Sequence, residues 1–473
     1  MHTSKLVQIL RKQPPKALKK ILEFANCPLH NSNSNITALF KYLLKSRTAP
    51  SFSHPTKLLK RHVFREIFPG RSYNDHKMRQ LLSLSVKMLE NFICLNELLD
   101  QKLLKDKILI EYYEQNQLKI FFCDQIRHFE DELIKQDLSS LQILSYKYDL
   151  NAYKSSHLYT GVSKTQANHF DPLLTNLDAY YYAIKLQYAT NIMAQTFVLR
   201  KVEPPHFITP LLAELKEAKF LDEPLIKLYY CALNFLMGQN PKENFVEYQE
   251  NLHNYSQRIP PRLLPELYSY GFNYAILQVL KGKDDYQIIL FKLHQDAIQQ
   301  EALLEDGFIQ TALYKNIATN ALRLKKYDWL EEFLETYRDH LPPKERADAY
   351  RYNMAKLFFE KKEYKKARHI SLTVEYANRF YQIDAKRLLC KIDYETNTRS
   401  LETILDALYM QMWREKDLTD STVKSNKNFV SVVRKLISIF NKEDFQKLLV
   451  QIEQTEVLAE RSWLLEKVKE KLK

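Results

Sequence analysis

Glycine is scarce in this chain: 6 of its 473 residues are glycine, whereas average proteins contain about 7%. Glycine is the residue that adopts positive φ most readily, so tight turns and the loops that wrap phosphate groups depend on it. Rossmann, P-loop, β-propeller and β-sandwich folds are therefore poor fits. Helical periodicity runs through the sequence, and no convincing alternating strand is found. The pattern predicts an all-α protein.

The length and composition predict a folded protein of more than one domain. Hydrophobic residues make up 45% of the chain and charged residues 27%, which is an ordinary balance for a globular protein. A chain of 473 residues is too long for one ordinary domain. We predict a basic helical N-terminal module over residues 1–100, a helical middle region over 101–200 and a helical-repeat solenoid over 201–473.

Short breaks divide the helical stretches. A loop is predicted over Lys154–Phe170, which contains Gly161 and lacks a clean helical period. The second half of the chain is predicted to be helix after helix. Its breaks are expected at Asp222–Pro224, Gly238–Pro241, Ile259–Pro261, Gly282–Asp285, Leu341–Pro343 and Asn397–Ser400.

A repeated pattern appears in this second half. Tyr286, Tyr327 and Tyr364 each follow a short charged turn, and an apolar helical stretch precedes each turn. The tyrosines are 41 and 37 residues apart. A period of this size in an all-helical sequence indicates stacked helix pairs. One pair cannot bury its apolar face alone, so neighbouring pairs share a core.

Two of these units resemble tetratricopeptide (TPR) repeats. The residues that carry the resemblance are Ala318, Tyr327, Leu330 and Pro342 in residues 311–342, and Ala355, Tyr364 and Ala367 in residues 348–379. The second unit departs from the pattern, because Arg379 stands where the closing proline is expected. The usual tryptophan of the first helix is replaced by Tyr314 in one unit and Arg351 in the other.

Over nearly its whole length the chain also resembles a family of uncharacterised TPR-like proteins of Bacteroidota-type bacteria. The stretches that carry this resemblance are FPGRSYNDHKMRQLLS (68–83), NLDAYYYAIKLQYA (176–189), residues 305–359 and AKRLLCKIDYE (385–395). The resemblance implies a TPR-like α-solenoid. It implies no particular activity, substrate or site.

The net charge of the protein is concentrated at its N-terminus. The whole chain carries a net charge of +13, and its first 90 residues contain 17 Lys and Arg but only four acidic residues. Such asymmetry points to an acidic partner, namely nucleic acid, an anionic protein surface or membrane phosphates; the alternative is a solvated basic face. The candidate anion-contacting residues are Lys57, Lys60, Arg61, Arg65, Arg71, Lys77 and Arg79.

The turn that ends this basic stretch is expected to be structural. Phe68 and Tyr73 flank Pro69 and Gly70, and Asn74 or Asp75 is placed to cap the following helix. We predict that both aromatic rings bury against the helix that runs from His76 to about Leu99.

No motif for catalysis, cofactor binding or metal binding is found. The chain contains no GxxxxGK[ST], GxGxxG, GxSxG or HExxH pattern, and its 13 histidines are scattered. We therefore predict a non-enzyme without a cofactor. The five cysteines lie far apart and are expected to be reduced core residues: Cys27, Cys94, Cys123, Cys231 and Cys390.

The sequence shows no signal for a membrane or for secretion. No stretch approaches the about 18 apolar residues of a membrane helix, and the first residues lack a secretory signal pattern. We expect a cytoplasmic protein without membrane insertion.

These observations favour a non-catalytic scaffold that binds proteins or peptides. The repeat alignment places five residues on the first helices of two pairs, facing a concave surface: Lys315, Thr319, Arg323, Tyr352 and Lys356. A basic and aromatic lining favours a partner segment that is acidic or contains aromatic residues. The alternative is a nucleic-acid-associated regulatory protein that uses the basic module of residues 1–100.

Overall fold

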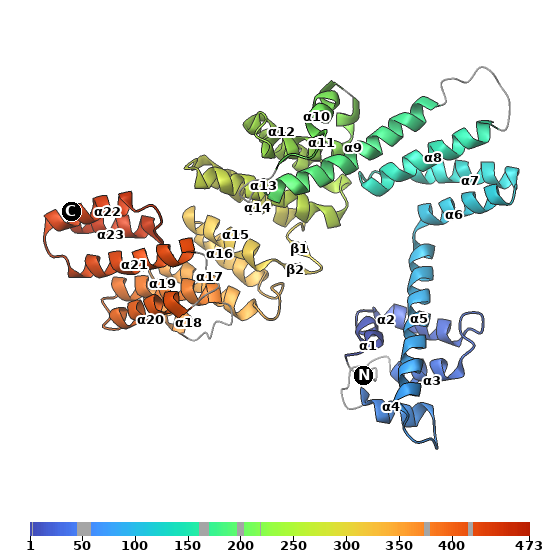
Figure 1. The fold of residues 1–473 in the computed structure, drawn as a ribbon, viewed down its shortest axis with the longest axis horizontal. Helices are drawn as coiled ribbons and strands as arrows, with labels where there is room; N and C mark the ends of the chain where they lie inside the picture. The colour runs from blue at the N-terminus through green and yellow to red at the C-terminus, as the bar shows by residue number, and fades with distance from the viewer. Residues whose placement is uncertain are drawn as a thin grey trace. The chain divides into compact units, whose positions relative to one another are not determined.

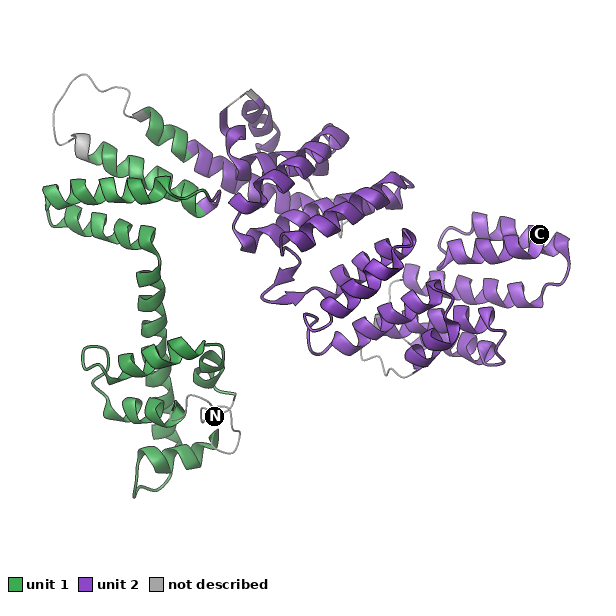
Figure 2. Cartoon of the chain, turned by 180° about the vertical axis from the view of Figure 1, so that it is seen from behind, with its two compact units in different colours: residues 1–137, 142–177 green, residues 138–141, 178–473 purple. Residues whose placement is uncertain are grey.

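In the residues that the computed structural model describes, helices are the regular structure apart from one small hairpin (Figure 1). The structure describes residues 1, 3–44, 58–159, 170–195, 203–217, 219–372, 379–414 and 420–473. These residues form 23 α-helices. They divide into two compact units, which Figure 2 colours separately: unit 1 comprises residues 1–137 and 142–177, and unit 2 comprises residues 138–141 and 178–473. The division at residues 100 and 200 stays a prediction.

Unit 1 contains two hydrophobic cores. Its helices are α1 (Lys5–Arg11), α2 (Pro15–Asn26), α3 (Ser34–Leu43), α4 (Lys60–Ile67), α5 (Asp75–Asp100), α6 (Lys102–Gln115), α7 (Lys119–Ile134) and α8 (Leu141–Tyr159), followed by the start of α9 (Phe170–Ala194). Helices α1 to α5 bury their apolar faces in one cluster, and α6 to α8 do so in another.

Local signals in the sequence account for the helix ends around the aromatic turn. The Asn74 side chain accepts a hydrogen bond of 2.9 Å from the Lys77 backbone N–H and so caps α5. Phe68 is buried, as predicted, and its ring lies 4.7 Å from that of Phe64. The prediction is wrong for Tyr73, which is only half-buried because its hydroxyl donates to Asp75; its ring meets that of Phe64 edge-on at 5.4 Å. The turn therefore joins α4 to α5 through packed rings.

Unit 2 continues with helix after helix. Its elements after α9 are α10 (Ile208–Glu217), the 3-10 helix η5 (Lys219–Asp222), α11 (Pro224–Leu236), α12 (Pro241–Tyr255), η6 (Ser256–Arg258), η7 (Pro261–Leu263), α13 (Leu264–Leu280), α14 (Asp285–Gln299), β1 (Leu304–Glu305), β2 (Phe308–Ile309), α15 (Thr311–Arg323), α16 (Tyr327–Thr336), α17 (Arg346–Glu360), α18 (Tyr364–Leu372), α19 (Arg379–Glu395), α20 (Leu401–Arg414), α21 (Asp420–Ser438), α22 (Lys442–Gln454) and α23 (Arg461–Leu472). The six predicted breaks of this region all fall at connections between these elements.

The helices of unit 2 pack against their neighbours in the chain and against the next helix but one. Contacts join α15 to α16 and α17, and α17 to α18 and α19. Two of the repeated tyrosines, Tyr327 and Tyr364, are the first residues of α16 and α18. The small residues Ala318 and Ala355 are fully buried in α15 and α17. Small side chains at these positions allow adjacent helices to approach closely.

The short hairpin was not predicted. Strands β1 and β2 pair antiparallel, with Leu304 opposite Ile309. The two turn residues, Asp306 and Gly307, have φ of 50° and 82°. This geometry requires positive φ at both positions, for which Asp-Gly is a favoured pair. The Asp-Gly dipeptide was therefore a usable signal, but the strands are too short to show an alternating pattern.

The loop prediction for Lys154–Phe170 is wrong at both ends, because its first six residues are helical and Phe170 is the first residue of α9. Helix α8 continues to Tyr159, and residues 160–169 lie outside the described residues. Packing against α7 explains the extension, because Lys154 forms a 2.5 Å ion pair with Glu130 of that helix. Ser155 is also buried there. Tertiary contacts thus extend a helix whose own periodicity is weak.

The expectation of five core cysteines is only partly correct. Cys231 and Cys390 are buried, but Cys27 and Cys123 are half-buried and Cys94 is exposed. Cys94 follows the buried Phe92 by two residues on α5, which places it about 200° further around the helix, on the solvent side. Among the described residues, no helix has the length and apolarity required to span a membrane.

Candidate functional site

Side chains from three helices of unit 2 meet in one charged cluster. Helices α15, α17 and α19 contact one another in succession, and charged residues face each other along this contact. We call the group the Lys356 cluster. It comprises Lys315 of α15, Lys356 of α17, Asp384, Arg387 and Lys391 of α19, and Glu460, which precedes α23.

Lys315 lies between a carboxylate and two aromatic rings. Its ammonium group forms an ion pair with Asp384. The same nitrogen lies 5.4 Å from the ring centroids of Tyr352 and Tyr381. Both rings are buried, so they present a fixed aromatic wall to the cation. Lys315 is therefore held in place while a third of its side chain stays exposed.

Lys356 lies at the centre of the cluster without a carboxylate partner. Its Nζ donates a 3.2 Å hydrogen bond to the hydroxyl of Thr319, and it forms no ion pair with any described carboxylate. Burial lowers the pKa of Lys356 to about 8. The nearby carboxylates of Glu460 and Asp384 oppose this shift, whereas the neighbouring cations Lys315 and Lys391 act with it. A negative charge added nearby would therefore stabilise the protonated form of Lys356.

Glu460 is the counterion of Lys391 and Arg387 in the cluster. Its carboxylate lies 2.9 Å from Lys391 Nζ and 3.7 Å from Arg387 Nε. Burial favours the neutral acid, but the charges of Lys391 and Arg387 outweigh it and lower the pKa of Glu460 to about 2. Lys391 also lies 4.6 Å from the ring centroid of Phe359.

Arg387 connects the two acids of the cluster. Its Nη2 bonds the Asp384 carboxylate, and its Nη1 donates to Asn426 Oδ1 at 3.1 Å. The cluster then holds four basic groups and two carboxylates, so it carries surplus positive charge while Lys356 is protonated. Such a surplus beside aromatic rings suits the binding of a carboxylate.

The structure brings together four of the five residues predicted for a binding groove. Lys315 lies over the Tyr352 ring and Lys356 bonds Thr319, and Lys356 Nζ also lies 5.8 Å from the ring centroid of Tyr352. Arg323 is exposed in the last turn of α15 and takes no part in the cluster.

Sequence reasoning missed the α19 residues and Glu460. Asp384, Arg387 and Lys391 recur at three- and four-residue spacing and so share one face of α19, which was a usable signal. No sequence signal pointed to Glu460, because only the tertiary fold brings it next to the α19 residues.

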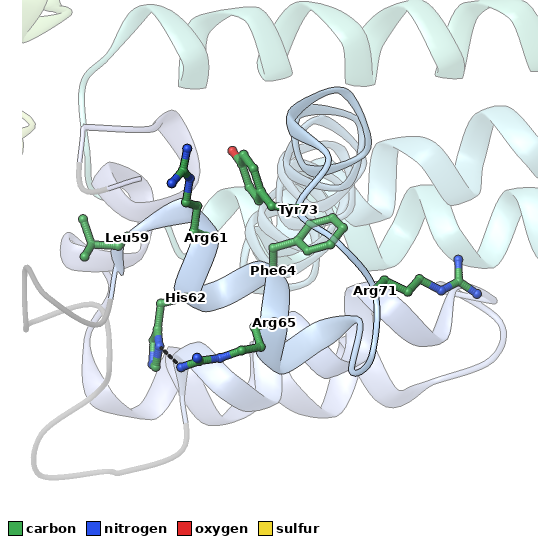
Figure 3. A pocket seen from close by; sticks show the side chains of 7 residues that line it. All are labelled: Leu59, Arg61, His62, Phe64, Arg65, Arg71 and Tyr73. Carbon is green, nitrogen blue, oxygen red and sulfur yellow. Dashed lines mark hydrogen bonds between the residues drawn. The ribbon is translucent and has the colours of Figure 1, made fainter.

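A second charged feature lies in unit 1. A depression of about 410 Å³ opens beside α4 and the turn that follows it. Figure 3 shows its lining, which is basic and aromatic and contains no acidic side chain. The lining residues are Leu59, Arg61, His62, Phe64, Arg65, Arg71 and Tyr73.

The seven residues predicted to contact an anion have different environments. Three of them, Arg61, Arg65 and Arg71, line the depression. Lys60 and Arg79 instead pair with Asp75, at 3.1 and 2.9 Å. The remaining two are Lys77, whose Nζ lies 4.5 Å from the ring centroid of Phe68, and Lys57, which lies outside the described residues.

Neither a metal centre nor a known relative suggests a chemistry for the chain. In the part of the chain that the structure describes, no three His, Cys, Asp or Glu side chains are grouped to hold a metal ion. Comparisons with protein-family models, curated proteins and solved structures give no match for this chain. The functional interpretation rests on the two charged features described above.

Proposed function

We propose that the chain is a non-catalytic scaffold of TPR-like helical repeats that binds a peptide segment of a partner protein. The observation that carries the proposal is the Lys356 cluster, in which cations from α15, α17 and α19 gather beside two buried tyrosine rings. The bound segment is acidic or contains aromatic residues. It lies across the three helices.

Several features of unit 2 support the repeat architecture. Tyr327 and Tyr364 begin equivalent helices, and Ala318, Ala355 and Ala367 are fully buried. The first helix of each pair contacts the first helix of the next pair from α15 to α19. In a TPR-like solenoid these first helices line a concave surface that accepts extended segments or helices. The resemblance to uncharacterised TPR-like proteins of Bacteroidota-type bacteria supports the same interpretation.

Charge complementarity favours a carboxylate-bearing ligand. Lys356 has a hydrogen bond to Thr319 and forms no direct ion pair with a described carboxylate; Glu460 and Asp384, which act on its charge from nearby, are themselves paired with other cations. A glutamate or aspartate of the partner would supply that counterion and would form charge-assisted hydrogen bonds. An aromatic residue of the same segment would pack on the exposed part of Lys315 through a cation–π contact.

Selection of peptides from a displayed random library against the full chain tests the proposal. We expect the selected sequences to be enriched in Asp, Glu and aromatic residues. A labelled synthetic copy of a selected peptide is then titrated by fluorescence anisotropy. The double variant Lys315→Met/Lys356→Met should bind it at least about tenfold more weakly, since a hydrogen bond to a charged group contributes about 1.5–3 kcal/mol.

A matched variant controls for the loss of charge. Lys325 and Lys326 are exposed in the turn between α15 and α16, so Lys325→Met/Lys326→Met removes the same charge outside the cluster. This control should bind as the wild type does. Tryptophan fluorescence spectra of both variants check that unit 2 is folded. Equal affinity of all three proteins, or selected peptides without acidic or aromatic enrichment, would refute the proposal.

A further inference from the structure

We propose that the depression beside α4 binds the phosphate backbone of nucleic acid through Arg61, Arg65 and Arg71. This site lies in unit 1 and shares no residue with the Lys356 cluster. The nucleic-acid proposal goes beyond the peptide-binding function. It would stand even if unit 2 were shown to bind no peptide.

Positive charge around the site is in excess. The first 90 residues account for the whole net charge of +13. Three of their four acidic residues are neutralised within the fold: Glu23 pairs with Lys19, Asp75 with Lys60 and Arg79, and Glu90 with Lys5. The fourth, Glu66, is exposed on α4 and does not line the depression. The lining arginines thus form no ion pair with any described carboxylate.

The guanidinium groups of the site are spread out. Arg61, Arg65 and Arg71 are all exposed. In Figure 3 they project in different directions around Phe64 and do not converge on one point. Converging cations would suit one small anion. Cations spread over a shallow depression suit an extended polyanion, in which successive charges meet successive side chains.

The side chains that line the depression suit phosphate and nucleobases. Guanidinium groups match phosphate oxygens through paired hydrogen bonds, and all three cations of the site are arginines. Arg61 lies 5.8 Å from the ring centroid of Tyr73, and this half-exposed ring offers a surface on which a base can stack. Among the lining residues, Leu59 alone is a large exposed apolar side chain. One leucine is too little to anchor the site in a lipid bilayer.

The test uses the full chain and two labelled probes: a DNA duplex of about 20 base pairs and a single strand of the same length. Anisotropy titrations are run at about 50 and 200 mM salt, where backbone-driven affinity falls steeply. Each phosphate contact on duplex DNA contributes about 0.9 to the log–log salt slope. A variant that lacks three contacts should have a slope smaller by about 2.7. Its duplex affinity should therefore fall about 40-fold less than that of the wild type between the two salt concentrations.

The test variant is Arg61→Gln/Arg65→Gln/Arg71→Gln, which changes only exposed side chains. Its control removes the same charge from exposed arginines of unit 2: Arg262→Gln/Arg399→Gln/Arg414→Gln. We expect the test variant to show weaker binding and the smaller salt dependence. The control should retain the affinity and the salt slope of the wild type. Equal weakening in both variants would show that net charge alone is responsible and would overturn the proposal.

Competition separates nucleic acid from other polyanions. Unlabelled poly-glutamate and vesicles that contain phosphatidylserine are added at matched total charge. Displacement of the duplex by unlabelled duplex but by neither competitor supports the proposal. Displacement by poly-glutamate would identify an acidic-protein site, and displacement by vesicles a membrane site. Either result would overturn it, as would the absence of binding to both probes at about 50 mM salt.

Discussion

Replacing Glu460 with glutamine should destabilise unit 2 measurably. Glu460→Gln keeps the size of the side chain and the local backbone but removes the counterion of Lys391 and Arg387. The lowering of the Glu460 pKa from 4.5 to about 2 measures how strongly the fold favours the ionised form. At about 1.4 kcal/mol per pKa unit, with some screening because the side chain is 30% exposed, the loss should be about 2–3 kcal/mol near neutral pH.

The effect should depend on pH in one direction. The folded-state pKa of Glu460 lies below its unfolded-state value, so its stabilisation is complete above about pH 5 and is lost as pH falls through 4.5 toward 2. The difference between the wild type and Glu460→Gln should therefore shrink by about two-fifths between about pH 7 and pH 3.5.

Tryptophan fluorescence during urea unfolding is the appropriate assay. The chain has three tryptophans, Trp329, Trp413 and Trp463, and all belong to unit 2. The control variant is Glu456→Gln, which changes an exposed glutamate four residues earlier. It should alter the stability by less than about 0.5 kcal/mol. A Glu460→Gln variant as stable as this control, or a loss that does not shrink in acid, would refute the electrostatic reasoning.

Three further predictions follow from buried or half-buried side chains. Burial lowers the pKa of His294 to about 3, so in mild acid the unfolded state binds a proton that the folded state does not. The wild type should therefore lose about 2 kcal/mol of stability between about pH 8 and pH 5, and His294→Leu should not. Parallel pH profiles of the two proteins, measured by tryptophan fluorescence, would contradict this. A bound carboxylate raises the pKa of Lys356, so the affinity for a selected acidic peptide should be complete below about pH 8 and fall above it, whereas Lys356→Met should show no such fall. Phe68→Ala should lower the stability of α5 by about 3–5 kcal/mol, measured by amide hydrogen exchange. Its control, Tyr73→Phe, loses only the 2.6 Å hydrogen bond to Asp75, and equal protection in both variants would exclude the packing role.

The helices and their ends were largely predictable because their signals are local. The charged turns before Tyr327 and Tyr364 give the starts of α16 and α18. Asn74 at the start of α5 is an ordinary helix cap. Helix α8 is an exception: it is longer than its own periodicity indicates, because Lys154 pairs with Glu130 of another helix.

The candidate site was predictable only within single helices. Four-residue spacing placed Lys315 and Thr319 on one face of α15, and the repeat pattern placed Lys356 at the equivalent position of α17. The partner of Lys315 is Asp384, 69 residues along the chain, and the partner of Lys391 is Glu460, another 69 residues away. Pairings over such separations leave no periodic trace in the sequence.

The sequence by itself determined the helical architecture, most of the helix boundaries and the concentration of basic residues in the first 90 positions. Only the tertiary structure decided which of those charges are neutralised: Lys60 is paired with Asp75, whereas Arg61 lines the depression one residue later. The low pKa of Lys356 is likewise decided only by the tertiary structure, because it results from burial among packed helices. The physical reason is that periodicity depends on neighbours along one helix, whereas the burial and the counterion of a charge depend on the helices that pack against it.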